Sequence, residues 1–110
     1  MISLHVYLTP KTGREKDLDS AVREGWLPAM SEQPGFLAAA VVSPYDDTQL
    51  EALGAVRPAP TLEAVSFWRT EAARLEWVAR PIHDEVFVKV IDAAEGVSHT
   101  LQNVEGSWGL

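Results

Sequence analysis

The sequence predicts a single α+β domain with the element order β-α-β-β-α-β. The chain has 110 residues, a length that one hydrophobic core serves, so residues 1–110 are expected to form one domain. Apolar residues alternate with polar ones in some stretches and recur every three to four residues in others, which are the periods of strands and helices. Segments containing proline or glycine separate these stretches, as is typical of turns.

The first strand is predicted over residues 2–8, where one face is apolar and the other carries Ser3, His5 and Tyr7. A helix is then predicted from Glu15 to the turn at Pro34-Gly35. Its apolar face consists of Leu18, Ala21, Val22, Gly25, Trp26, Ala29 and Met30. Pro28 interrupts this pattern, and because proline lacks an N–H and clashes with the preceding turn, we expect a kink or an early break there.

The middle of the chain predicts two strands separated by a long excursion. Residues 36–42 are almost entirely apolar, which is typical of a strand covered on both faces. Residues 43–61 contain Pro44, Pro58 and Pro60 and form the excursion, with room for a short helix within 48–56. Loops of this length are uncommon and often functional. The third strand is expected over 62–69.

The second helix is predicted to begin after Thr70, whose hydroxyl can accept an unpaired backbone N–H. Pro81 divides it, since proline suits only the first turn of a helix. The second half is expected to turn Ile82, Val86, Val90 and Ala93 inward and to end at Gly96. A weakly patterned strand follows at 97–104.

Four strands and two helices in this order give a ferredoxin-like fold, in which a four-stranded antiparallel sheet carries both helices on one face. The other face would retain valine, phenylalanine, leucine and aromatic side chains. Because soluble proteins avoid apolar patches above about 400 Å², we expect two subunits to pack sheet against sheet as a homodimer.

Composition limits the possible partners. The formal net charge of −7, with no basic cluster, disfavours nucleic acids and anionic membrane surfaces. The absence of cysteine excludes disulfides and thiolate metal sites. No apolar run approaches the roughly 20 residues that span a bilayer, and the N-terminus lacks the features of a signal peptide. We therefore expect a cytoplasmic protein.

Four segments resemble the antibiotic biosynthesis monooxygenase-like family, whose fold is a dimeric α+β barrel. The first three are the opening of the first helix at 10–15, the turn Glu32-Gln33-Pro34-Gly35-Phe36, and the junction Ser66-Phe67-Trp68-Arg69-Thr70-Glu71. The fourth comprises Trp77 and Pro81-Ile82-His83. The resemblance covers nearly the whole chain except the excursion at 43–61.

The resemblance implies a pocket between sheet and helices that holds a planar aromatic substrate, with no bound metal or flavin. It implies catalytic roles for Trp68, which would stack on the substrate, and for His83, whose imidazole can accept a proton near neutral pH. Trp68 could equally be a core or interface residue, and His83 an exposed helix-terminal histidine. Asp84 should point about 100° away from His83 on the helix and is not expected to pair with it.

Further side chains are expected to contact the substrate: Tyr7, His5, Trp77, His99 and Phe67. His5 and His99 would line one cavity if the first and last strands are neighbours. Three histidines without i, i+4 spacing or a paired carboxylate make a poor metal signature, so no metal site is expected.

Two departures from the family affect the predicted chemistry. The haem-degrading branch uses an asparagine on the first strand and a histidine further along the second helix, where this chain has Val6 and Phe87. Haem degradation is therefore not expected. The quinone-forming branch uses an asparagine four residues before its tryptophan, where Ala64 stands. Three hypotheses follow: a cofactor-independent oxygenase, a non-catalytic dimeric module that binds a small ligand, and an isomerase or lyase that uses His83 without oxygen.

Overall fold

A computed structural model describes residues 1–59 and 61–110; Pro60, which falls in the predicted excursion, lies outside the described residues. The elements follow the predicted order. They are β1 (Ile2–Pro10), α1 (Glu15–Ser20), the π-helical turn η1 (Ala21–Trp26), α2 (Leu27–Ser31), β2 (Phe36–Val42), α3 (Asp47–Leu53), β3 (Leu62–Trp68), α4 (Glu71–Ala79), α5 (Pro81–Ala93) and β4 (Ala94–Asn103).

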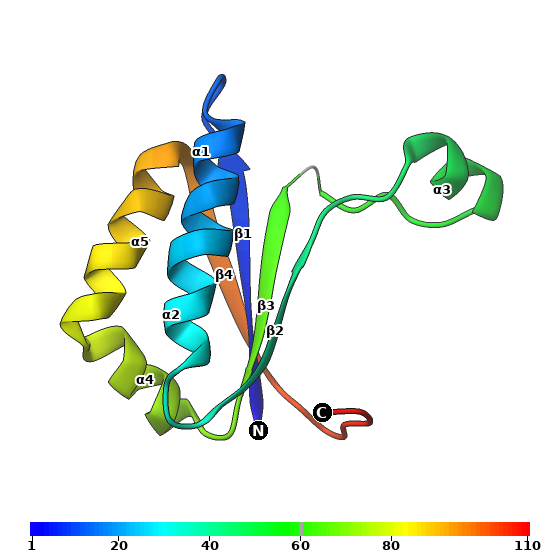
Figure 1. Ribbon diagram of the computed structural model, residues 1–110. Coiled ribbons are helices and arrows are strands. Elements are labelled where there is room, and N and C mark those ends of the chain that lie inside the picture. The colour runs from blue at the N-terminus through cyan, green and yellow to red at the C-terminus, as the bar shows by residue number, and fades with distance from the viewer. Residues whose placement is uncertain (60) are drawn as a thin grey trace.

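The four strands form one antiparallel sheet in the order β2-β3-β1-β4. Figure 1 shows α1, α2, α4 and α5 together on one side of this sheet, while α3 projects on an arm toward the other side. The predicted ferredoxin-like fold is therefore confirmed. We call the sheet face under the helices the inner face and the opposite one the open face.

The core lies between the helices and the inner face. On β1 the inner side chains Leu4, Val6 and Leu8 are all buried. The helices cover them with further buried side chains: Leu18, Val22, Trp26, Met30, Trp77, Val90 and Ala93. Leu18, Val22, Trp26 and Met30 belong to the apolar face that the period of the first helix predicts.

Pro28 does not break the first helix. Helices α1 and α2 are joined by η1, in which the N–H of Leu27 bonds to the carbonyl of Val22, five residues earlier. A regular turn would press the proline ring against the carbonyl of Glu24. The widened π-helical turn just before the proline relieves that clash, so the helix continues where a kink or break is expected.

The second helix begins and divides as predicted. Ala73 donates its backbone N–H to the Thr70 hydroxyl at 3.1 Å, and the extended backbone of Arg80 separates α4 from α5. The predicted end at Gly96 is wrong. Ala94 is already extended, with φ −102° and ψ 134°, and it pairs with Pro10 at the end of the β1–β4 ladder. Ile82 is 38% exposed rather than inward.

The prediction for β2 is also wrong in one respect. The strand lies at the edge of the sheet, and Ala39 and Ala40 are exposed rather than covered on both faces. The following arm contains α3, which Asp46 begins by accepting the N–H of Gln49 and which Gly54 ends at a φ of +65°. No side chain of α3 is buried, so the arm adds nothing to the core of one subunit.

The open face is mixed in character. The strand register places four larger apolar or aromatic side chains there, those of Tyr7, Val42, Val65 and Phe67. Between and beside them are polar ones: Ser3, His5, Glu63, Ser98, Thr100 and Gln102. The leucines of β1 and β4 face the helices instead, so this face is less apolar than the sequence predicts.

Candidate functional site

A cavity of about 220 Å³ lies between the helices and the inner face of the sheet. It lies where the junction of α4 and α5 faces the central strand β1 and the edge strand β4. Its lining is mostly apolar and aromatic, with three nitrogen-bearing polar side chains. The lining residues are Leu4, Val6, Trp26, Met30, Arg74, Trp77, Val78, His83, Phe87, Val97 and His99. Concave, mainly apolar sites with a few convergent polar groups are the usual form of small-molecule sites.

His83 is held within an aromatic cluster on one wall of this cavity. Its ring centroid lies 5.1 Å from that of Trp77 in an edge-on arrangement and 5.3 Å from that of Phe87. Phe87 in turn lies 5.1 Å from Trp26. Spacings of 4.5–7 Å are those at which aromatic rings attract each other. The side chain of His83 is only 13% exposed, so its imidazole is fixed in place and faces little solvent.

The local sequence explains this placement. Pro81 starts α5, and the N–H of His83 bonds to the carbonyl of Arg80 at 3.0 Å, which closes the first turn. His83 and Phe87 are then one helical turn apart on one face. Contrary to expectation, Nδ1 of His83 lies 3.3 Å from Oδ1 of Asp84. The Asp84 side chain is 88% exposed and the contact is long, so solvent screens the interaction between the two groups.

His99 and His5 do not share a cavity. Their strands are neighbours, as expected, but the register pairs His99 with Val6 and His5 with Thr100. Because side chains alternate between the faces of a sheet, His99 lies on the inner face, where it lines the cavity, and His5 lies on the open face. The cavity therefore combines His99 with His83 rather than with His5.

Trp68 is a core residue. Its side chain is fully buried, its indole Nε1 donates to Ser66 Oγ at 3.1 Å, and Phe36 meets its ring edge-on at 5.6 Å. It does not line the cavity. Of the two readings that the sequence leaves open for Trp68, this environment supports the structural one.

The other predicted contact residues lie on the open face. His5 Nε2 lies 2.9 Å from Ser3 Oγ, and its Nδ1 lies 2.9 Å from Glu63 Oε1. Both ring nitrogens are thus engaged within the sheet. Phe67 and His5 line a shallow hollow beside the C-terminal segment, whereas Tyr7 lines a smaller one at the base of the arm. The structure therefore brings together His83, Trp77 and His99 and separates them from His5, Tyr7, Phe67 and Trp68.

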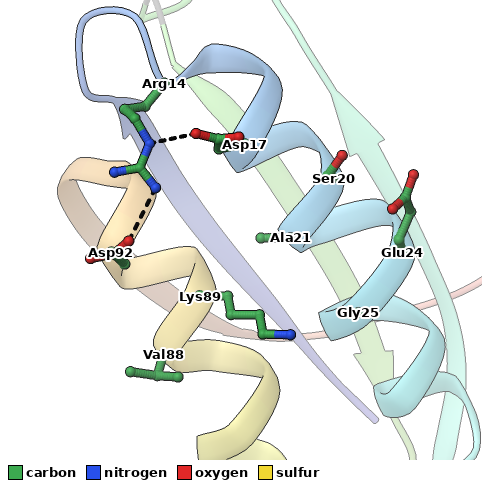
Figure 2. A pocket seen from close by; sticks show the side chains of 9 residues that line it. All are labelled: Arg14, Asp17, Ser20, Ala21, Glu24, Gly25, Val88, Lys89 and Asp92. Atoms are coloured by element: carbon green, nitrogen blue, oxygen red, sulfur yellow. Dashed lines mark hydrogen bonds and ion pairs between the residues drawn. The ribbon is translucent and has the colours of Figure 1, made fainter.

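A larger groove of about 760 Å³ runs along the outer surface between the first helix and α5. Figure 2 shows Arg14 there, joined to both Asp17 and Asp92, with Lys89 reaching across from α5. The hydrogen bond from Arg14 is the main cause that lowers the pKa of the Asp92 carboxyl. These charges are exposed and satisfy each other, so the groove offers a ligand little beyond what water already provides.

Of the eleven lining residues, the sequence predicts only Trp77, His83 and His99 as site residues; the others include Arg74, Trp26 and Phe87. Spacing could have indicated Arg74, because it lies three residues before Trp77 and four before Val78, on one helix face.

Within residues 1–59 and 61–110, no group of three histidine, aspartate or glutamate side chains is arranged to hold a metal ion. In the same part of the chain, no helix has the length and apolarity needed to cross a membrane.

No protein-family model matches the chain, and no curated protein matches it in sequence. Solved structures do match. SnoaB, a cofactor-independent oxygenase from Streptomyces nogalater, superposes with a TM-score of 0.75 at 12% identity, over 99% of this chain and 97% of that one. A provisionally named antibiotic biosynthesis monooxygenase from Nitrosomonas europaea gives a TM-score of 0.73 at 14% identity, over 96% and 100%.

A similarly named protein from Deinococcus radiodurans gives a TM-score of 0.71 at 13% identity, over 100% of this chain and 98% of that one. The likeness thus extends over nearly the whole of each chain. It confirms the fold that the resemblance in sequence implies, and at these identities it shows the fold alone.

Proposed function

We propose that this protein is a cofactor-independent oxygenase that oxidises a small hydroxylated aromatic compound in the cavity between helices and sheet. The observation that carries the proposal is the placement of the His83 imidazole, held between Trp77 and Phe87, on the wall of a mainly apolar cavity. The fold shared with SnoaB, itself a cofactor-independent oxygenase, supports it.

The chemistry needs a base, a dry pocket and orientation of the ring. His83 accepts the proton of a phenolic hydroxyl, and the resulting phenolate transfers one electron to O₂. Recombination of the two radicals, with return of the proton from the His83 imidazolium, gives a hydroperoxide on the ring carbon, and loss of water leaves a quinone carbonyl. One oxygen atom enters the product and the other leaves as water, so O₂ is the only oxidant required. The apolar walls keep water from the phenolate.

The cavity size limits the substrate. At about 220 Å³ it lies below the range of roughly 300–1,000 Å³ that is typical of sites for drug-sized ligands. One- and two-ring phenols such as 1-naphthol are therefore the first compounds to test, followed by tricyclic hydroxyanthrones.

The test is oxygen uptake with these phenols by the parent protein and by His83→Ala and His83→Phe. His83→Phe keeps an aromatic ring between Trp77 and Phe87 but removes the base. We expect turnover by the parent and a decrease of about 10²- to 10⁴-fold in kcat for both variants, the usual contribution of a general base. Equal turnover in all three proteins, or none in any, would reject the proposal.

A second candidate function is non-catalytic binding of a small aromatic ligand. The observation that favours it is Ala64, which is buried between Val6 and Val41 on the inner face, so β3 supplies no polar group to the cavity. Native mass spectrometry of freshly purified protein would reveal a bound compound. A bound compound without oxygen uptake favours this function, and conversion of the compound without oxygen uptake favours an isomerase or lyase.

We also propose that the open face is the interface of a homodimer. Tyr7, Val65 and Phe67 lie there, and Figure 1 shows the arm and the C-terminal segment projecting on that side. Both carry exposed apolar side chains, with Val56 and Trp108 at least 90% exposed. Light scattering should find a dimer at micromolar concentration, and replacing residues 44–59 by a short glycine-serine linker should weaken it without unfolding the subunit. A stable monomer would refute this arrangement.

A further inference from the structure

The polar groups of the cavity have one sign of charge. Arg74 is the only permanently charged side chain that lines it, and His83 and His99 can only add positive charge. Among the lining residues that the structure describes there is no carboxylate. The positive charge of the lining side chains contrasts with the net charge of the whole chain, which is −7. Hydrogen-bond donors of this kind in a mainly apolar cavity favour a ligand that brings acceptor oxygens to them.

The guanidinium of Arg74 is oriented before any ligand binds. Its Nε donates to Glu71 Oε2 at 2.8 Å and its Nη2 donates to Glu71 Oε1, the bidentate geometry that fixes a guanidinium plane. Glu71 lies one turn earlier on α4 and does not line the cavity. The hydrogen bond from Arg74 lowers the pKa of the Glu71 carboxyl, so the pair stays charged at neutral pH.

The pairing leaves Arg74 with donors to spare. A guanidinium has five N–H groups, and the two contacts with Glu71 engage two of them. The Arg74 side chain is only 13% exposed, so water reaches the rest poorly. Trp26, another lining residue, has a buried indole N–H without a partner. Unsatisfied buried donors are rare in folded proteins, and acceptor oxygens on a ligand would satisfy the remaining donors of Arg74.

We propose that the cavity takes an aromatic carboxylate, such as a hydroxylated benzoate or naphthoate, whose carboxylate accepts hydrogen bonds from Arg74. The ring then packs among Trp26, Trp77 and Phe87, which leaves a phenolic hydroxyl to meet His83. This assignment rests on the proposed function for the location of the site, and it names the substrate class that the site selects.

The test is a binding titration without oxygen, using 3-hydroxy-2-naphthoate and its neutral amide. The two compounds have nearly the same shape, but the amide lacks the negative charge and has an N–H donor group in place of one acceptor oxygen. We expect the carboxylate to bind the parent protein at least tenfold more tightly, since hydrogen bonds to charged groups are about twice as strong as neutral ones. Arg74→Met should abolish this preference by weakening carboxylate binding about 10- to 100-fold, while Arg74→Lys should retain part of it. Arg80→Met, an exposed position outside the cavity, is the matched control and should change nothing.

Several results would overturn the assignment. Equal affinity for carboxylate and amide would do so, as would the absence of binding by either compound. An equal loss for both compounds in Arg74→Met would also do so, with Arg74→Lys serving as the test if Arg74→Met does not fold. Because no turnover is measured, failure of the oxygenase proposal is seen separately: Arg74-dependent carboxylate binding without oxygen uptake would keep the ligand class and reject the reaction.

Discussion

Trp68→Phe tests whether the tryptophan at the end of β3 serves stability or chemistry. The substitution removes the indole N–H, so Ser66 Oγ loses the hydrogen bond that it accepts from Trp68. Ser66 is 3% exposed. An unsatisfied buried polar group costs about 1–3 kcal/mol. The lost ring atoms leave a void of the order of 40 Å³, which at about 24 cal/mol per Å³ adds about 1 kcal/mol. We therefore expect a loss of about 2–4 kcal/mol.

Urea unfolding followed by circular dichroism measures this loss, and Trp108→Phe is the matched control. Trp108 is 90% exposed, so the same chemical change should alter the stability of the subunit by less than about 0.5 kcal/mol. Below the unfolding transition, Trp68→Phe should bind hydroxynaphthoate within about threefold of the parent. Unchanged stability together with lost binding or turnover would refute the structural role and would show that Trp68 acts in ligand binding or catalysis.

Three further predictions follow from local geometry. Gly35→Ala should lower the free energy of unfolding by clearly more than Gly13→Ala. Both glycines have a φ above +80°, but only at Gly35 would the new Cβ lie 2.5 Å from Ala73 Cβ. Equal losses of stability in urea unfolding would contradict this. Because the pKa of Glu71 is lowered by Arg74, the pair stabilises the fold above about pH 4.3 and the effect is lost as the pH falls through the depressed pKa. After discounting for exposure we expect about 0.5–1 kcal/mol, and Glu71→Gln should remove this part of the acid dependence of unfolding. Asp84→Asn should lower any oxygen uptake by less than about threefold, because the carboxylate is 88% exposed and 3.3 Å from His83; a loss near that of His83→Ala would show a working dyad.

The fold was predictable because its signals are local and repeated. The alternation in β1 and the helical face from Leu18 to Met30 each depend on residues whose spacing fixes which side is buried. Thr70 and Pro81 mark helix ends by chemistry that acts within one turn. Pro28 shows the limit of this reasoning, because its effect depends on whether the preceding turn can widen, which the packing of Val22 and Trp26 decides.

The site was predictable only in part, because it depends on strand register and on contacts between distant elements. The partition of His5 and His99 between two faces follows from the register of β1 with β4, in which a shift of one residue would exchange them. Trp68 and Trp77 are both buried aromatic residues, and only the packing of α4 on the sheet places one of them at the cavity. The sequence does not predict Arg74 as a site residue, because a lone arginine in a helix most often lies in solvent.

The most direct test of the site uses the four tryptophans of the chain as reporters. Two line the cavity, Trp26 and Trp77, whereas Trp68 is in the core and Trp108 is exposed near the open face. In a ¹H–¹⁵N correlation spectrum during titration with hydroxynaphthoate, the indole signals of Trp26 and Trp77 should shift and those of Trp68 and Trp108 should stay. Shifts confined to Trp68 or Trp108 would show that the ligand binds elsewhere and would contradict the account.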